Sequence, residues 1–279
     1  MIRALRPEFP SLSVHRMSQL VGISRSLVYA PQRQKSRPEL LLAIERLVVL
    51  FLGYGYRRVR RALQLEGVAV SEYAVRKLMR EHGLMARRPR SRGVTRPGAR
   101  DRRAGNLLKG LSASAPNQIW VADTTRVRTD SGPLYLAALM DLYSRKAVAW
   151  HLSRRNDEAL VRDCLLKALQ TRKPNLGWIH HSDQGSTYTA SGYMRLIRDA
   201  GGKTSFSAPG KPRDNAHMES FFRTVKLEEV DRNRYGSFLD AQASLEHFID
   251  AIYNQQRMHS SLEYMSPDQF ESRPTKEAR

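Results

Sequence analysis

A polar, arginine-rich stretch divides the sequence and limits what it can fold into. Residues 86–116 consist mainly of Arg, Pro, Gly and Ser and contain almost no apolar side chains. Such a segment cannot bury a hydrophobic core, so we expect a linker or an arm that a polyanion can order. The chain has 279 residues, which is enough for a folded domain on each side of this linker.

The positive charge lies mostly in the first part of the chain. The formal net charge is +20. Residues 1–110 contain 24 Lys and Arg against 7 Asp and Glu, whereas residues 111–279 contain 23 against 20. A basic module next to a nearly neutral domain indicates that one part binds phosphates and the other has a different task. An anionic membrane is a less suitable partner, because no segment has an amphipathic Trp/Phe/Leu face.

The sequence predicts a soluble protein of a reducing compartment. The longest apolar run, Leu47–Leu52, is far too short to span a bilayer, and residues 1–10 lack the apolar run of a signal peptide. The single cysteine, Cys164, can form neither an internal disulfide nor a Cys-rich zinc site. We therefore expect a cytoplasmic protein.

Residues 1–37 have the pattern of a helix-turn-helix segment. Ser13 can cap one helix, Gly22 can form the turn, and Ser24 can cap a second short helix. This pattern is typical of DNA-binding modules. An ordinary helical hairpin has the same pattern, so both interpretations stay open.

Residues 38–85 predict a second helical module. Ser71 is a candidate N-cap, and Gly67 and Gly83 are candidate C-terminal stops. One of its helices carries four arginines without an interleaved acid: Arg57, Arg58, Arg60 and Arg61. A run of like charges is usually a solvated face, but these four repel one another unless an anion binds.

The chain after the linker alternates between strands and helices. Strands are expected within residues 117–128, 132–145, 146–153, 175–185 and 203–208. Helices are expected within residues 156–172, 189–201, 213–230 and 238–257. Three hairpin-like strands followed by alternating helices and strands predict an α/β fold, with a mixed sheet and helices on its faces.

Three acidic residues occupy positions that need an explanation. Asp123 lies inside a strand, where acids are depleted, and Asp183 follows the end of another strand. Glu219 lies in a helix, two turns before Lys226 and on the same face. Each one also has an ordinary explanation: an ion pair, a turn before Gly185, or a surface glutamate.

Together these three acids could hold Mg²⁺, which prefers hard oxygen ligands. Two such ions about 3.5–4 Å apart would clamp the attacking and leaving oxygens of a phosphodiester displacement. The metals would convert an acidic cluster into a phosphate site within a basic chain. Ser182 and Ser186 have no base placed by the sequence, so no nucleophilic side chain is predicted.

Residues next to these acids have more modest interpretations. His180 and His181 could position phosphates or water, or simply satisfy local hydrogen bonds. Asn215 could bond DNA or cap its helix. Asp141 is expected to be structural, paired with Arg145.

The three acids and their surroundings resemble the DDE transposases, which have a retroviral integrase-like core. Asp183 and Glu219 are separated by 35 residues, a spacing typical of that triad. The resemblance is to OrfB, the second reading-frame product of the bacterial insertion-sequence family three. It rests on the segments WVADTT, MDLYSRKAVAW, HHSDQGSTYTA, DNAHMESFFRTVKLE and YNQQRMHSSLEYMSP. Upstream, GYGYRRVRRALQLEGVAVSEYAVRKLMREHGL resembles the helix-turn-helix module of the same family.

The resemblance implies an RNase H-like core with a mixed five-stranded sheet, preceded by all-α helix-turn-helix modules. The domains would be a helix-turn-helix-like segment, a helical DNA-binding module, a basic linker, a catalytic core, and a C-terminal helix and tail. Their expected ranges are 1–37, 38–85, 86–116, 117–235 and 236–279.

The resemblance also implies a reaction and its participants. Metal-dependent cleavage at the element's ends would be followed by 3′-OH strand transfer, without a covalent protein intermediate. Asp123, Asp183 and Glu219 would be catalytic and would bind two Mg²⁺ ions, with Mn²⁺ as a substitute. The expected DNA contacts are Lys226, Arg223, Arg57, Arg58, Arg60, Arg61, Arg87, Arg88 and Arg257, with His259 as a further candidate.

The expected partners are double-stranded DNA, in the form of terminal inverted repeats and target, and further copies of the chain in a synaptic complex. The family also implies an OrfA partner or an OrfA–OrfB fusion. Two other functions stay open. One is a structure-specific, metal-dependent nuclease on the same fold, and the other is a DNA-binding regulator for which the three acids are dispensable.

Overall fold

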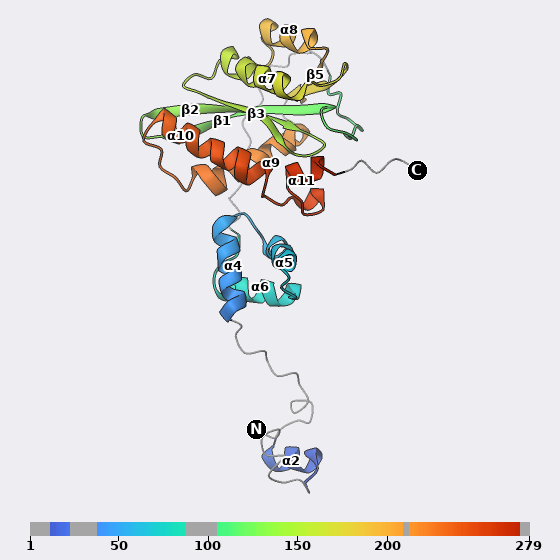
Figure 1. Ribbon diagram of the computed structural model, residues 1–279, viewed down its shortest axis with the longest axis vertical. Helices are drawn as coiled ribbons and strands as arrows, with labels where there is room; N and C mark the ends of the chain where they lie inside the picture. Colours follow the sequence, from blue (N-terminus) through green and yellow to red (C-terminus); the bar gives the residue numbers. More distant parts are fainter. Residues whose placement is uncertain (1–11, 23–37, 87–104, 209–211, 274–279) are drawn as a thin grey trace. The chain divides into compact units, whose positions relative to one another are not determined.

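The first helix that the structure describes lies in the N-terminal unit. The computed structural model describes residues 12–22, 38–86, 105–208 and 212–273 (Figure 1), and the chain divides into Met1–Ala43 and Ile44–Arg279. Helix α2 (Val14–Val21) begins at Ser13, whose hydroxyl accepts a hydrogen bond from the Arg16 amide, and ends at Gly22 with φ 69°. These caps confirm the first predicted helix. The second one, from Ser24, lies outside the described residues, as do Arg87 and Arg88.

Three helices precede the linker, as the sequence predicts. They are α4 (Pro38–Leu50), α5 (Tyr56–Leu65) and α6 (Glu72–Glu81). Ser71 caps α6 by accepting a hydrogen bond from the Ala74 amide. Gly67 and Gly83 have φ values of 80° and 69°, which suit glycine because it carries no Cβ. Both stops are therefore confirmed.

The core contains a mixed five-stranded sheet. Its strands are β1 (Ile119–Thr129), β2 (Gly132–Asp141), β3 (Ala147–Ser153), β4 (Ile179–Ser182) and β5 (Lys203–Phe206). Their order is β3-β2-β1-β4-β5. The first three strands pair antiparallel, whereas β4 and β5 run parallel to β1. This confirms the predicted mixed sheet of an α/β fold.

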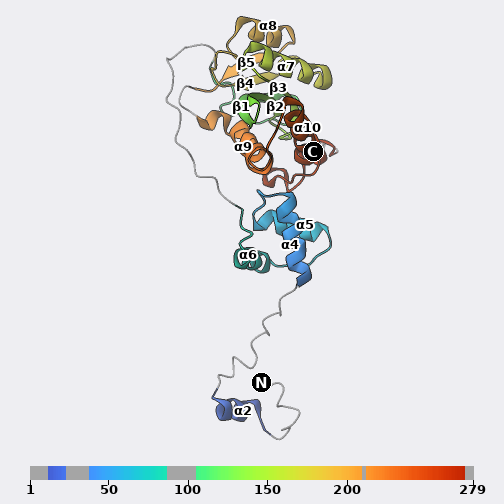
Figure 2. The same cartoon turned by 90° about the vertical axis from the view of Figure 1, so that its left-hand side faces the viewer.

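Helices cover both faces of this sheet. Helices α7 (Glu158–Arg172) and α8 (Ser191–Asp199) lie on one face, and α9 (Ala216–Val225) and α10 (Phe238–Glu246) on the other (Figures 1 and 2). Along β1, Trp120 and Ala122 pack in the α7/α8 cluster, whereas Val121 packs in the α9/α10 cluster. Side chains alternate along a strand, so Asp123 lies on the α9 side.

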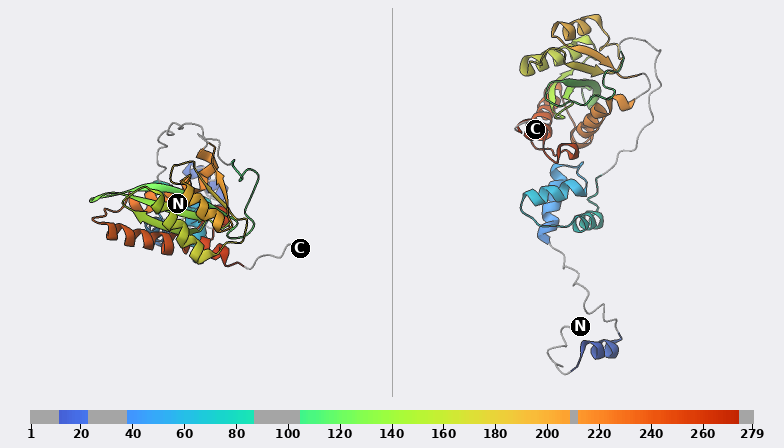
Figure 3. Two further views of the ribbon diagram at one scale, coloured as in Figure 1. Left: turned by 90° about the horizontal axis from the view of Figure 1, so that it is seen from above. Right: turned by 90° about the vertical axis from the view of Figure 1, so that its right-hand side faces the viewer.

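Short elements complete the core. Pro212–Asn215 forms η1 and Ser260–Leu262 forms η4, both 3₁₀ turns, and α11 spans Pro267–Glu271. Helices α9 and α10 continue into the π-helical segments η2 (Lys226–Val230) and η3 (His247–Asn254). Figure 3 shows α9 and α8 on opposite sides of the sheet from a further direction. None of the described helices is long and apolar enough to cross a membrane.

Candidate active site

The register of two parallel strands places Asp123 beside Asp183. The last paired positions of β1 and β4 are Val121 and His181, and each aspartate lies two residues farther along its strand direction. Because side chains alternate, a step of two residues keeps both carboxylates on one face. Strand ends of this kind are common positions for functional groups in α/β sheets.

Glu219 approaches the same place from α9. The start of this helix is attached to β1, because Asn215 Nδ2 donates a hydrogen bond of 3.1 Å to the carbonyl of Ala122, next to Asp123. Glu219 follows one turn later, near the start of α9. The Asn215 side chain thus bonds the strand rather than the helix end, where it makes no cap hydrogen bond.

Three charged side chains act on the carboxyl group of Asp123: Asp183, Glu219 and Lys226. The pKa of the Asp123 carboxyl is raised to about 7: burial is the largest cause and the negative charges of Asp183 and Glu219 add to it, whereas the Thr124 amide and Lys226 act to lower the pKa. The amide donates to Asp123 Oδ1 at 2.7 Å. The structure therefore places Asp123 close to both other predicted acids and to Lys226.

The other two acids are exposed to solvent. Asp183 Oδ1 accepts a hydrogen bond of 3.0 Å from the Gly185 amide. A Cβ at Gly185 would lie 3.0 Å from this oxygen, so glycine leaves room for the carboxylate. Within the described ranges, no three His, Cys, Asp or Glu side chains converge as metal ligands.

The chemistry of these donors fits Mg²⁺. Three carboxylates offer hard oxygens, and Lys226 supplies one positive charge against three negative ones. Asn215 Oδ1 adds a buried oxygen without a hydrogen-bond partner among the described residues. A divalent cation would lower the cost of keeping Asp123 ionised in its buried position.

The two histidines of β4 serve the protein interior. His181 bonds Ser205 at 2.8 Å through Nδ1 and Ser207 at 3.0 Å through Nε2, and His180 Nε2 lies 2.8 Å from the Tyr193 hydroxyl. Burial lowers the pKa of His180 to about 3. Of the two interpretations, the structure favours local hydrogen bonding over phosphate binding.

Asp141 is structural, as expected, but the prediction that it pairs with Arg145 is wrong. Its carboxylate accepts hydrogen bonds from the amides of Asn117 and Tyr143 and lies 3.8 Å from Arg172 Nη2. Arg145 instead has a φ of 62° and a buried Nη1 without a hydrogen-bond partner in the described part of the chain. Burial lowers the pKa of Arg145, and the charge of Asp141 opposes this shift without an ion pair between the two side chains.

The four arginines of α5 have different surroundings. Arg57 and Arg61 are exposed, and Arg57 lies 3.8 Å from Glu72. Arg60 donates to the carbonyl of Val70 at 3.2 Å. Arg58 is half-buried, with its guanidinium 5.6 Å from the centre of the Tyr54 ring. Sequence proximity therefore does not make them one surface.

Arg257 is held inside the protein, in contrast to its expected role as a DNA contact. It is 4% exposed and donates two hydrogen bonds to Glu228, at 2.9 and 2.7 Å. The pairing could not be read from the sequence, because 29 residues separate the partners. Arg223 is exposed and Lys226 is half-buried, both on the helix that carries Glu219.

Family models match most of the chain. Two models described as integrase core domain match residues 113–212 and 200–267, and an HTH-like domain matches residues 39–92.

Individual proteins are similar over most of their length. The transposase for insertion sequence element IS904 of Lactococcus lactis is 40% identical over 220 residues, covering 78% of this chain and 87% of that protein. An uncharacterized 31 kDa protein of insertion element IS600 from Shigella sonnei is 36% identical over 263 residues, covering 91% and 97%. Among solved structures, the HTLV-2 integrase catalytic core in complex with magnesium is 15% identical, covers 57% of this chain and 98% of its own, and has a TM-score of 0.40.

Proposed function

This chain belongs to the transposases of the bacterial insertion-sequence family three, and we propose that Asp123, Asp183 and Glu219 are the catalytic acids with which it cleaves and joins DNA. Its general function is DNA transposition and integration. The observation that carries the finer assignment is the raised pKa of Asp123, which the charges of Asp183 and Glu219 increase. The register of β1 and β4 supports it independently.

The proposed cofactor is a pair of Mg²⁺ ions, for which Mn²⁺ can substitute. Asp123, Asp183 and Glu219 would hold them, and Asn215 Oδ1 is a fourth oxygen nearby. Bound there, the ions would activate the attacking oxygen and stabilise the leaving one. The carboxylates have few other hydrogen-bond partners, and those of Asp123 and Asp183 are backbone amides of neighbouring residues.

The chain's own residues would bind and orient the DNA. In the first step, water attacks a phosphodiester at an element end, the bond to the 3′ oxygen breaks, and a free 3′-OH is released. In the second step, this 3′-OH attacks another phosphodiester, so one bond forms for each bond that breaks. Arg223 and Lys226 lie one and two helical turns from Glu219, respectively, and would hold the flanking phosphates.

The proposal extends to the other expected participants. The helical module of residues 38–85 and the basic linker of residues 86–116 would bind DNA before the core of residues 117–235. Terminal repeats and target DNA would meet in a complex of several copies, with OrfA as a partner or fused segment. The reaction would occur in the cytoplasm, where the bacterial DNA lies.

A cleavage assay tests this proposal. Labelled element-end DNA is incubated with the protein and its upstream-frame partner in Mg²⁺, in Mn²⁺, or with a chelator. Cleavage and joining should require the metal and disappear in Asp183→Asn. Asp199→Asn, which removes an exposed carboxylate at the end of α8, is the matched control and should retain activity.

Other outcomes would select another function. Cuts without joined products would favour the nuclease. Tight DNA binding without cleavage in either metal would favour the DNA-binding regulator.

A further inference from the structure

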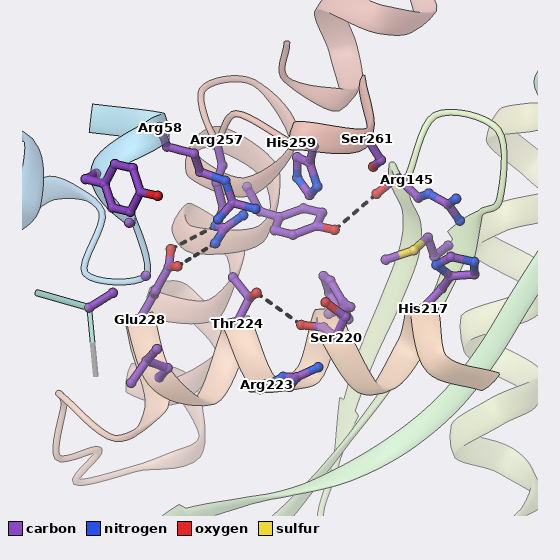
Figure 4. Close-up of a pocket in the computed structure, with 18 of the residues that line it drawn as sticks. Arg58, Arg145, His217, Ser220, Arg223, Thr224, Glu228, Arg257, His259 and Ser261 are labelled. Carbon is purple, nitrogen blue, oxygen red and sulfur yellow. Dashed lines mark hydrogen bonds and ion pairs between the residues drawn. The ribbon is translucent and has the colours of Figure 1, made fainter. Parts of the chain in front are cut away.

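A cavity of about 690 Å³ lies along the flank of α9, beside the candidate active site (Figure 4). An α-helix turns by about 100° per residue. His217, Ser220 and Thr224 are therefore rotated by about 100–160° from Glu219, and all three line the cavity. Arg223, at about 40°, lies between the two sites. The cavity is thus separate from the three acids, but it lies along the helix that carries Glu219.

The cavity wall is strongly basic. Its cationic or titratable basic side chains come from α5, the loop after β2, α9 and the segment before η4: Arg58, Arg145, Arg223, Arg257, His217 and His259. Glu228 is the one acid among the described lining residues. Arg257 already binds both of its carboxylate oxygens. The pair contributes no free negative charge to the wall.

Arg58 and Arg145 form no ion pair within 4 Å in the described ranges, and the charges of Glu228 and Asp141 act on them only from farther away. Arg58 contacts the face of Tyr54, and burial and the charge of Arg257 lower its pKa. Arg145 has a buried Nη1 with no hydrogen-bond partner among the residues that the structure describes. Figure 4 shows Arg58 and Arg145 at opposite sides of the cavity. A partly buried cation without a close counter-ion is costly, and a bound anion would lower that cost.

Neutral donors also face this space. His259 Nε2 is buried without a partner among the described residues, and burial together with nearby arginines lowers the pKa of His259 to about 3. A neutral imidazole can donate one hydrogen bond without adding charge. Ser261 lies beside it in the wall (Figure 4). The set of donors suits an anion with several oxygens.

We propose that this cavity is a second DNA-binding site, in which Arg58 and Arg145 bind backbone phosphates of the strand that leaves the active site past Arg223. The assignment deepens the proposed transposase function and rests on it. Phosphate is the appropriate anion because guanidinium groups bind its oxygens through paired hydrogen bonds. Arg223 is exposed on α9, lines the cavity and lies one turn after Glu219, so a strand could contact it between the two sites.

Salt dependence of DNA binding tests this proposal in the full chain. The affinity for a duplex of the element's own end is measured between low and high salt for the wild type, Arg58→Gln, Arg58→Lys and Arg195→Gln. Each lost phosphate contact reduces the slope of log K against log salt by about one unit. Arg58→Gln should show this reduction and Arg58→Lys should restore most of it. Arg195 is exposed on α8, over the other face of the sheet. Arg195→Gln should therefore leave the slope unchanged.

Arg145→Gln is the second variant, and thermal unfolding checks that both variants are folded. Equal slopes for the wild type and folded Arg58→Gln would overturn the proposal. Inorganic phosphate tests the other source of the anion. If phosphate raised the Tm of the wild type but not of Arg58→Gln, while both proteins showed the same salt slope for DNA, the cavity would bind free phosphate and the proposal would be overturned.

Assaying Asp183→Asn in parallel distinguishes a failure of the proposed catalytic acids from a failure of the proposed phosphate site. If Asp183→Asn still cleaves while Arg58→Gln lowers the slope, the catalytic assignment fails and the phosphate site holds.

Discussion

Asn215 and Ala122 connect the two elements that carry the candidate acids. Asn215 Nδ2 donates a hydrogen bond of 3.1 Å to the Ala122 carbonyl, and Asp123 follows Ala122 directly in β1. The bond fixes the start of α9 against the strand, and Glu219 lies one turn farther along. The distance between Asp123 and Glu219 thus depends on a side chain that belongs to neither.

We expect Asn215→Ala to slow strand transfer while the protein stays folded. Losing one hydrogen bond should cost about 0.5–1.5 kcal/mol of unfolding free energy, but a displaced Glu219 should slow the reaction by roughly tenfold or more. Rates of joining, DNA affinity and urea unfolding measure the three effects. Asn233→Ala removes the side-chain hydrogen bonds that Asn233 Nδ2 donates to the carbonyl and the carboxylate of Glu229, and should leave the rate nearly unchanged. Equal rate losses in both variants would argue against a positioning role for Asn215.

The buried pair of Arg257 and Glu228 should be a strong determinant of stability. The two side chains are 5% and 3% exposed, so removing one partner leaves a buried charge. Arg257→Ala should lower the unfolding free energy by about 3–5 kcal/mol, whereas Arg273→Ala, at a more exposed pair with Glu263, should have a much smaller effect because solvent screens that pair. Urea denaturation gives both values. If Arg257→Ala weakened DNA binding without loss of stability, Arg257 would be a DNA contact after all.

Gly53 should be intolerant of a side chain. A Cβ at Gly53 would overlap Glu228 Oε1 and approach Arg257 Nη2 to 3.2 Å. Gly53→Ala must therefore displace the buried pair and should cost about 1–3 kcal/mol. Gly55→Ala provides the control, because nothing lies within 4 Å of its added Cβ. Thermal unfolding of both variants decides the question, and similar Tm values would show that Glu228 moves without strain.

Cys164 should not react in the native protein. It is fully buried, and burial raises the pKa of its thiol above the ordinary value. The reactive thiolate is therefore scarce, and its labelling by a maleimide or disulfide reagent should not increase between pH 7 and pH 9. In denaturant the thiol should react at once. Rapid native labelling that rises with pH would show that this part of the core opens.

The strand pattern and the acids could be predicted from sequence because both are local signals. Alternating and continuous apolar runs marked β1 and β2, and Asp123 stood out as an acid inside a strand. The caps at Ser13 and Ser71 were equally local, since each side chain bonds an amide three residues away.

The surroundings of the arginines could not be predicted, because they depend on contacts between distant residues. Arg257 lies in a segment whose sequence gives no sign that Glu228 faces it. Arg145 follows Asp141 by four residues and has a positive φ, yet the carboxylate of Asp141 lies within ion-pair distance of Arg172 instead. The cavity beside α9 joins residues from 53 to 261, so no sequence window contains it.

The central claim is that three acids support strand transfer, and a pre-cut substrate tests it most directly. An element end that already carries a free 3′-OH needs no cleavage, so joining to target DNA reports transfer alone. With Mg²⁺, the wild type and Glu246→Gln, which lacks an exposed carboxylate of α10, should join equally. Glu219→Gln should reduce joining by at least about 10³-fold, roughly 4 kcal/mol of barrier. Joining by Glu219→Gln at the wild-type rate would contradict the account.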